Sequence, residues 1–260
     1  MAADVKASSP GGAAQFRALH RRGEPVILPN AWDAASARAV EAAGFPAVAT
    51  SSAAVAESLG YSDGESTPAH EMLDAVSRIV RVLNVPVTVD MERGYGMAPA
   101  ELVERLAATG AVGCNLEDSD PRTGRLIDMG EQVAFLGDVR AAANSAGLDL
   151  VINARIDTYL MDARSDEPVA ETRRRALEYR KAGADCVYPI KLGDGEAIAR
   201  LVDQIGGPVN ILYRPGGPTI AELAALGVAR ISFASGLYRA VHGKFAELLA
   251  EIRLPAAGRS

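Results

Sequence analysis

The sequence predicts an α/β fold, specifically a single-domain (β/α)8 TIM barrel. Eight short apolar runs alternate with stretches in which apolar residues recur at helical spacing. Several of these runs follow a small residue and a glycine suited to ending a helix, as at Ala43-Gly44 and Thr109-Gly110. The 260 residues also suit a barrel, which commonly uses about 250. A doubly wound open sheet is the alternative, but no G-x-G-x-x-G pattern follows the first run.

The predicted strands fall into two sets according to what precedes them. The first, third and seventh open on a recurring Pro-Val pair, at Pro25, Pro86 and Pro208, and Leu148–Leu150 takes the fifth place. The second, fourth, sixth and eighth follow the helix-ending glycines. The predicted strands are Pro25–Pro29, Ala47–Ser51, Val85–Asp90, Ala111–Glu117, Leu148–Ala154, Asp185–Ile190, Val209–Tyr213 and Arg230–Ala234.

The stretches that follow the strands show helical apolar spacing. The predicted helices are Ala31–Ala43, Pro68–Leu83, Ala98–Ala108, Gly130–Ala146, Val169–Ala182, Glu196–Ile205, Ile220–Leu226 and Leu237–Ile252. A further helix is expected before the first strand. The barrel is expected to span residues 13–253. The small, polar ends, 1–12 and 254–260, are predicted to be disordered.

Composition limits the partners and the compartment. The net charge is −6 with acids and bases interspersed, which argues against nucleic acid or an anionic membrane as a partner. No apolar run is long enough to span a membrane, and the start does not resemble a signal peptide. Cys114 and Cys186 lie in apolar runs and predict buried thiols in a reducing compartment. We expect a cytoplasmic protein that acts on a small molecule.

Acidic residues stand at the ends of two successive strands. Asp90 and Glu92 end the third, and Glu117 and Asp118 end the fourth. Ionised carboxylates are unfavourable there unless a cation compensates them. In a barrel these ends meet at the mouth that carries the active site. The pattern predicts a site for Mg²⁺ or Mn²⁺ held by Asp90, Glu92 and Glu117, with Asp118 facing the other way.

Other strand ends add candidates. Arg155 follows the fifth strand, and an arginine beside a carboxylate-held metal suits a bidentate carboxylate substrate whose enolate must be stabilised. Ser51 and Ser52 either pack tightly or offer N–H and hydroxyl groups to a carboxylate, and Asn210, near the seventh strand end, is expected to bind substrate. The histidines fall on helical stretches and are interpreted as solvated: His20, His70 and His242.

Taken together, several segments resemble the isocitrate lyase/phosphoenolpyruvate mutase superfamily, from about Leu28 to Ile252. They are LPNAWDAASA, the small-residue loop TSSAAVAESLGYSDGE, VDMERGYG, NLEDSDP and INARIDTYL. The resemblance implies a Mg²⁺-dependent barrel that makes or breaks a C–C or P–C bond next to an α-oxo or α-hydroxy carboxylate. It also implies a homo-oligomer, a tetramer or a dimer, in which the C-terminal helix packs on or swaps with a neighbouring subunit.

The resemblance implies roles for individual residues. Asp90 would bind the metal directly, and water would link it to Glu92, Glu117 and Asp63. The catalytic residues would be Arg155, Asp63 and Glu117. The substrate would be bound by Ser51, Ser52, Ala53, Asp90 and Arg155. A lid over Ser119–Met129 would cover an anion through Arg122 and Arg125.

The lid departs from the pattern of the family. Members that cleave isocitrate or methylisocitrate carry a Lys-Lys-Cys-Gly-His-type segment that supplies a thiol acid, and the mutases carry a lid lysine and asparagine. Here the lid reads SDPRTGRLIDM and has none of these residues. We therefore favour a lyase or decarboxylase that acts on a small 2-oxo or 2-hydroxy dicarboxylate through a metal-stabilised enolate, because solvent can protonate the enolate.

Three alternatives remain open at this stage. A phosphonopyruvate-type C–P reaction fits the superfamily but lacks its lid groups. A Schiff-base aldolase would use Lys191, which ends the sixth strand, yet it would leave the acidic cluster unexplained. A non-catalytic 2-oxo acid binding protein would keep the metal site and lack the chemistry.

Overall fold

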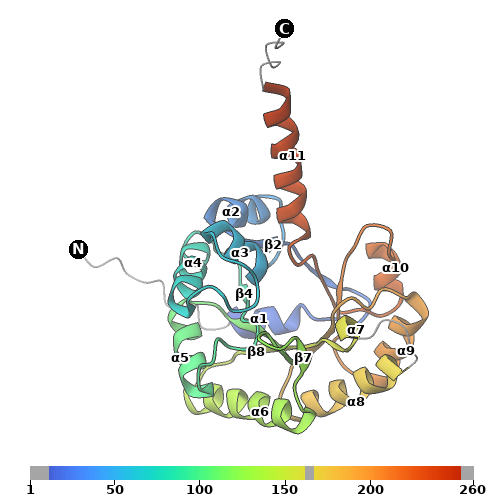
Figure 1. The fold of residues 1–260 in the computed structure, drawn as a ribbon. Helices are drawn as coiled ribbons and strands as arrows, with labels where there is room; N and C mark the ends of the chain where they lie inside the picture. Colours follow the sequence, from blue (N-terminus) through green and yellow to red (C-terminus); the bar gives the residue numbers. More distant parts are fainter. Residues whose placement is uncertain (1–11, 162–166, 253–260) are drawn as a thin grey trace.

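The computed structural model describes residues 12–161 and 167–252, and these form a (β/α)8 barrel (Figure 1). The strands are β1 (Val26–Leu28), β2 (Asn30–Ala31), β3 (Val48–Thr50), β4 (Val87–Asp90), β5 (Gly113–Glu117), β6 (Ser119–Asp120), β7 (Arg125–Leu126), β8 (Val151–Ile156), β9 (Cys186–Pro189), β10 (Asn210–Leu212) and β11 (Arg230–Ser232). The helices are α1 (Gly12–Ala18), α2 (Ala34–Ala42), α3 (Ser52–Leu59), α4 (Ala69–Arg81), α5 (Pro99–Ala108), α6 (Met129–Ser145), α7 (Thr158–Met161), α8 (Glu167–Lys181), α9 (Gly195–Ile205), α10 (Ile220–Ala225) and α11 (Gly236–Ile252).

The strand ladder closes into a ring. Parallel pairing runs β2-β3-β4-β5-β8-β9 on one side and β1-β11-β10 on the other. A parallel bridge between Val187 and Val209 joins the two arcs at one seam. At the other seam Pro29 alone separates β1 from β2, so the first predicted strand serves both arcs. Because the ring leaves no open edge at either seam, the barrel prediction is confirmed and the open sheet is excluded.

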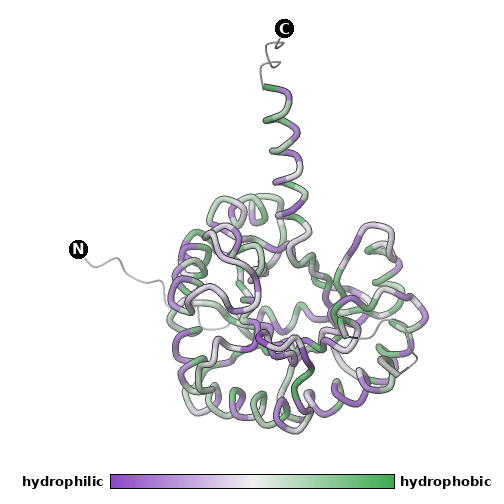
Figure 2. Tube along the Cα trace, viewed as in Figure 1, coloured by the Kyte–Doolittle hydropathy of each residue, from purple (hydrophilic) through white to green (hydrophobic). Residues whose placement is uncertain are grey.

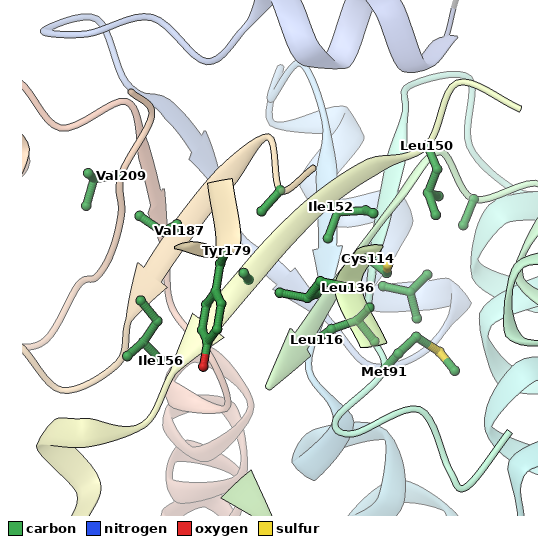
Figure 3. Packing of buried hydrophobic residues seen from close by; sticks show 14 of the residues in the cluster. Met91, Cys114, Leu116, Leu136, Leu150, Ile152, Ile156, Tyr179, Val187 and Val209 are labelled. Atoms are coloured by element: carbon green, nitrogen blue, oxygen red, sulfur yellow. The ribbon is translucent and has the colours of Figure 1, made fainter. Parts of the chain in front are cut away.

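Towards their C-terminal ends, β4, β5 and β8 alternate between an apolar outer face and a polar inner face. Leu116 and Ile152 are fully buried and pack outward with helix residues such as Leu136 and Tyr179 (Figure 3). Side chains on a strand alternate in direction, so the intervening positions point into the barrel. These are the positions of Thr88, Asp90, Asn115, Glu117, Asn153 and Arg155. The alternation therefore carries the candidate site residues to the inside.

Helix α1 closes the end of the barrel away from the strand C-termini. Phe16 is fully buried in a cluster with Val26 and Val151, which lie at the N-terminal ends of β1 and β8. Arg17 donates to Asp185 at 2.8 Å and thereby fastens the helix to the segment that enters β9. The predicted N-terminal helix is thus confirmed, and it acts as a plug.

Two segments differ from their predicted form. The segment read as a small-residue loop contains helix α3, because Ser51 caps its first turn by accepting a hydrogen bond from the Ala54 N–H. Within the predicted lid, β6 and β7 pair as an antiparallel hairpin. Both segments follow strand C-termini, so both lie at the mouth of the barrel.

The ends of the chain lie largely outside the described residues. The predicted disordered ends, 1–12 and 254–260, fall there except for Gly12, which begins α1 instead. In the described part of the chain, no helix is long and apolar enough to cross a membrane. The cytoplasmic location stays a prediction.

The interpretation of His20 as a solvated residue is wrong. His20 lies just beyond α1, where its ring meets Phe16 edge-on at 4.9 Å between centroids. Its Nδ1 is 2.9 Å from the Phe16 carbonyl oxygen, and its Nε2 has no partner among the described residues. Burial, reinforced by the charge of Arg230, lowers the pKa of His20 to about 4. The plug therefore holds a neutral imidazole.

This histidine predicts acid sensitivity. Because its pKa is lower in the folded state, the unfolded state binds the proton first, and stability falls as the pH drops from about 6.5 towards about 4. Over this pH window, the free energy of unfolding of the wild-type protein should fall by up to about 3 kcal/mol more than that of His20→Gln. Urea unfolding at pH 7 and pH 4.5 measures the difference. Parallel losses in the two proteins would show that His20 is protonated in the folded state.

Candidate active site

The ends of β4, β5 and β8 lie side by side at the mouth of the barrel. The strand register places Asp90 beside Asn115 and Glu117 beside Arg155. Strand pairing therefore brings together the acids and the arginine that the sequence predicted to be functional. Asp90 and Arg155, for example, are 65 positions apart in the sequence.

Asp90 is half-buried and is oriented by the N-terminus of α3. Its Oδ2 accepts from the Ser52 N–H at 3.1 Å and from the Ser52 hydroxyl at 2.8 Å. Its backbone N–H donates to the Thr50 hydroxyl at 3.0 Å. Among the described residues no hydrogen bond is made by the N–H of Ala53, which lies in the first turn of α3. A helix N-terminus of this kind suits an anion.

Glu92 fastens two loops of the mouth to each other. Its Oε1 accepts from the Tyr95 hydroxyl at 2.6 Å, and its Oε2 accepts from the Glu65 N–H at 2.8 Å. Glu65 in turn accepts from the Tyr95 N–H at 2.6 Å. All three residues have left-handed φ angles, between 46° and 57°, which are strained for side chains of this size. This reciprocal contact holds the Asp63 loop against the end of β4.

Burial raises the pKa of Glu92 to about 7, and the charges of Asp90 and Asp63 add to the shift. Asp63 lies in an exposed loop, yet partial burial of its carboxylate and the charge of Asp90 raise its pKa as well. Burial is the larger cause of both shifts, and repulsion between the neighbouring carboxylates adds to it. A cation at that space would favour their ionised forms.

Arg155 lies between two carboxylates. Its Nε and Nη2 donate to the two oxygens of Asp157 at 2.7 and 3.1 Å, and its Nη1 contacts Glu117. Burial alone would lower the pKa of Arg155, but the charges of Asp157, Glu117 and Asp90 raise it. Burial also raises the pKa of Glu117 well above its usual value, against the opposing charge of Arg155. The guanidinium keeps further N–H groups for a third anion.

Asp118 has a structural role, in agreement with the prediction that its side chain faces away from the site. It is fully buried and accepts from Arg175 at 3.0 Å and from the Tyr179 hydroxyl at 2.8 Å, on the outer side of the barrel. Its other oxygen accepts from the Asp157 N–H at 2.8 Å. Asp118 therefore braces the residue that orients Arg155.

The remaining predicted residues are less closely connected to the acids. Asn210 begins β10 and bonds Ser232 inside the barrel instead of lining its rim. Arg122 and Arg125 are exposed on the β6–β7 hairpin, where the Arg122 N–H donates to Asp120. Lys191 is exposed, with a φ of 65°, and lacks the desolvated pocket that activates a Schiff-base amine. The lid role of the two arginines stays a prediction.

The donor set fits a hydrated hard cation. In the described residues, no three of the Asp, Glu, His and Cys side chains are close enough to hold a metal directly. Mg²⁺, however, usually keeps several waters and takes one or two protein carboxylates. A site in which Asp90 alone binds the ion directly, and water links the ion to the neighbouring acids, needs no cluster of three direct ligands and suits the hydration of Mg²⁺. The mutual repulsion of the acids supports such an ion.

The sequence analysis did not identify two residues that contact the candidate site residues Asp90 and Arg155. Asn115 lies on β5 beside Asp90, and its Nδ2 is 3.5 Å from Asp90 Oδ1. Asp157, two positions after Arg155, supplies both acceptors that orient the guanidinium. The signal for Asn115 is present in the pattern, since a polar residue two positions before Glu117 shares its inward face.

A closed barrel with a carboxylate cluster and an arginine at its C-terminal mouth defines a barrel enzyme that acts on small anionic substrates. The family model of phosphoenolpyruvate phosphomutase matches residues 16–253, and the chain belongs to that family, within the isocitrate lyase/phosphoenolpyruvate mutase superfamily. The predicted resemblance is confirmed.

Individual relatives agree with this assignment. A solved structure from Burkholderia cenocepacia, named as a proposed phosphonomutase, is 42% identical, has a TM-score of 0.89 and covers 92% of this chain and 99% of its own. An uncharacterised protein of Mycobacterium tuberculosis is 38% identical over 87% of this chain and 86% of its own length. The 2,3-dimethylmalate lyase of Eubacterium barkeri is 30% identical over 83% and 77%. Lyases are among these relatives, and the chain belongs with them to a superfamily of enzymes.

The Arg155 geometry predicts the outcome of a conservative change. Arg155→Lys keeps the charge but cannot donate in parallel to Asp157 while also contacting Glu117 and an anion. Oxalate binding in the presence of Mg²⁺ should weaken by roughly 1.5–3 kcal/mol, or ten- to a hundredfold. Calorimetry measures this, with the exposed Arg105→Lys as the control. Equal oxalate affinity in the two variants would assign Arg155 a purely structural role.

Proposed function

We propose that the protein is a Mg²⁺-dependent lyase or decarboxylase that acts on a small 2-oxo or 2-hydroxy dicarboxylate and yields a pyruvate-like product. The observation that carries the proposal is the register that places Asp90, Asn115, Glu117 and Arg155 together at one mouth. Anion-binding and cation-binding groups meet there, as a carboxylate substrate with a developing enolate requires. The lyases among the relatives support a dicarboxylate of this size.

The chain's own groups have separable tasks in this proposal. Bound Mg²⁺ would act as a Lewis acid towards the oxygens of a 2-oxo carboxylate. Arg155 binds the substrate carboxylate and stabilises the charge that develops on the neighbouring oxygen. The Ala53 N–H and the Ser51 hydroxyl, at the start of α3, bind the other carboxylate oxygen. Asp63 is the proposed proton donor, and both the burial of its carboxyl group and the charge of Asp90 raise its pKa.

The predicted lid contains no cysteine, which favours a reaction that needs no thiol as a proton donor. Both cysteines of the sequence are fully buried, and burial raises the pKa of each thiol to about 12, so neither supplies a proton donor at the mouth. Decarboxylation, or cleavage followed by protonation from Asp63 or solvent, agrees with this arrangement. Isocitrate and methylisocitrate are accordingly expected to be poor substrates.

The first test of this proposal concerns the metal. Mg²⁺ or Mn²⁺ at about 100 times its Kd should stabilise the fold by about 2.7 kcal/mol and raise the Tm by roughly 5 °C or more. Asp90→Ala should abolish the shift, whereas Asp74→Ala, on the exposed face of α4, should keep it. An NMR screen of 2-oxo and 2-hydroxy dicarboxylates with Mg²⁺ should then show pyruvate or a related product. A wild-type Tm indifferent to both ions would contradict the proposal.

A carbon–phosphorus reaction is the second candidate function. It is favoured by the family description and by the 42% identity to a proposed phosphonomutase. The exposed Arg122 and Arg125 would then have to cover a phosphoryl group, in place of the lid lysine and asparagine of the mutases. Phosphorus NMR with phosphonopyruvate separates the two candidates, since only this reaction changes the C–P signal. A 2-oxo acid binding protein would show the thermal shift and no turnover.

We also propose that the protein is a homo-oligomer built through α11. This helix runs away from the ring and anchors only its first turns, where Tyr238 stacks edge-on with Trp32 at 5.2 Å between centroids (Figure 1). Hydrophobic residues recur along its projecting part (Figure 2). They lie on one face at 46–76% exposure and are Val241, Phe245, Leu248, Leu249 and Ile252.

The apolar face predicts the effect of a single charge. Phe245→Glu should lower the mass of the particle in light scattering, because a carboxylate would be buried in the subunit contact. Ala250→Glu, on the opposite side of the helix, should leave the mass unchanged. A monomeric wild type, or equal masses in both variants and the wild type, would contradict an assembly through this face.

A further inference from the structure

An arginine with no ionic partner among the described residues lies inside the barrel, below the acidic cluster. Arg230 on β11 is fully buried and is the largest fully buried side chain of the described residues. Its Nη2 donates to Asn115 Oδ1 at 3.1 Å. Its Nε and Nη1 have no hydrogen-bond partner, and it forms no ion pair, among the described residues. The Phe16 ring, 5.8 Å from the guanidinium carbon, provides a weaker cation–π contact.

Such a side chain is hard to explain as a stabilising element. A buried charge without an ionic partner is unfavourable, and replacing buried charges by apolar groups is often neutral or stabilising. Arg175 offers a contrast within the same chain. It is also buried, but it contacts Asp118 at 3.0 Å and Glu171 at 2.7 Å. The one hydrogen bond of Arg230 is to the amide oxygen of Asn115, so any orienting effect on the site passes through that residue.

Asn115 connects Arg230 to the candidate metal ligand. Its Oδ1 accepts a second hydrogen bond, from Asn153 Nδ2 at 2.8 Å. Two donors on Oδ1 fix which end of the amide is oxygen, and a rotation by 180° would set N–H against N–H. The Nδ2 is then directed to Asp90 Oδ1 at 3.5 Å, a distance that a small movement of either group would shorten.

We propose that Arg230 is a positioning residue that acts through Asn115 to orient the Asp90 carboxylate for its cation. The inference rests on the proposed function, because it takes Asp90 as the direct ligand. One Asp90 oxygen is held by Ser52, and the other is approached by Asn115. Together these contacts define the direction of the lone pairs left for a ligand. Groups that orient metal ligands commonly change metal affinity ten- to a hundredfold when removed.

Cation affinity distinguishes an orienting role of Arg230 from a purely electrostatic one, because loss of the two roles would change the affinity in opposite directions. Arg230→Met removes a positive charge below the site, and the loss of that charge alone would strengthen the binding of Mn²⁺. Loss of the Asn115 orientation would weaken it. Electron paramagnetic resonance of free Mn²⁺ measures the Kd directly and does not depend on turnover.

The experiment compares four proteins. Arg230→Met and Asn115→Leu should each bind Mn²⁺ at least about tenfold more weakly than wild type, with little or no loss in Tm. The double variant should be no weaker than Asn115→Leu, since the two residues act in series. Arg140→Met is the control: it removes an ion pair with Asp185, just before β9 and away from the mouth, and should lower the Tm and leave Mn²⁺ affinity unchanged.

A crystal structure of Arg230→Met adds a readout that needs no metal. The Asn115 amide should be rotated, or the Asp90 carboxylate turned, relative to wild type. Unchanged positions of both groups, or Mn²⁺ binding equal to or tighter than that of wild type, would overturn the proposal. Absence of Mn²⁺ binding in wild-type protein would refute the proposed metal site instead, and with it the role of Arg230. Should Arg230→Met fail to fold, the Kd of Asn115→Leu decides the question.

Discussion

The burial of several carboxylates close together at the ends of β4 and β5 is the constraint on which the mouth of the barrel depends. The pKa values of Glu92, Asp63 and Glu117 are all raised by burial, and the charge of Asp90 adds to each shift. The surrounding contacts hold these groups close despite the repulsion. Ser52 fixes Asp90, Tyr95 and Glu65 fix Glu92, and Arg155 neutralises part of the charge. These like charges, held close together, are the basis on which we propose a cation here.

Much of this arrangement follows from sequence pattern, because barrel geometry converts strand ends into neighbours. The eight predicted strands and eight predicted helices are found within a few residues of their expected positions. Once the barrel closes, Asp90, Glu117 and Arg155 must share a mouth, whatever their distance along the chain. The outward direction of the Asp118 side chain is also predictable from the sequence, because side chains alternate in direction along a strand.

The missed features depend on contacts between segments that pattern does not connect. Helix α3 looked like a loop because its small residues carry little apolar periodicity, yet the Ser51 cap starts it. His20 looked solvated because the plug that covers it is formed by α1 against the barrel floor. Arg230 stood in an apolar strand with no visible partner, and its acceptor Asn115 is 115 positions away. Pairwise geometry decides such cases, and local sequence does not.

The most direct test of the account is a crystal structure grown with Mn²⁺ and oxalate, with anomalous data collected for manganese. The account predicts an anomalous peak at roughly 2.1 Å from an Asp90 oxygen, as for a hard octahedral ion, with oxalate between that peak and Arg155. Waters should link the peak to the neighbouring acids. A peak remote from Asp90, or oxalate bound at the same place without manganese, would contradict the claim that the carboxylates are gathered to hold a cation.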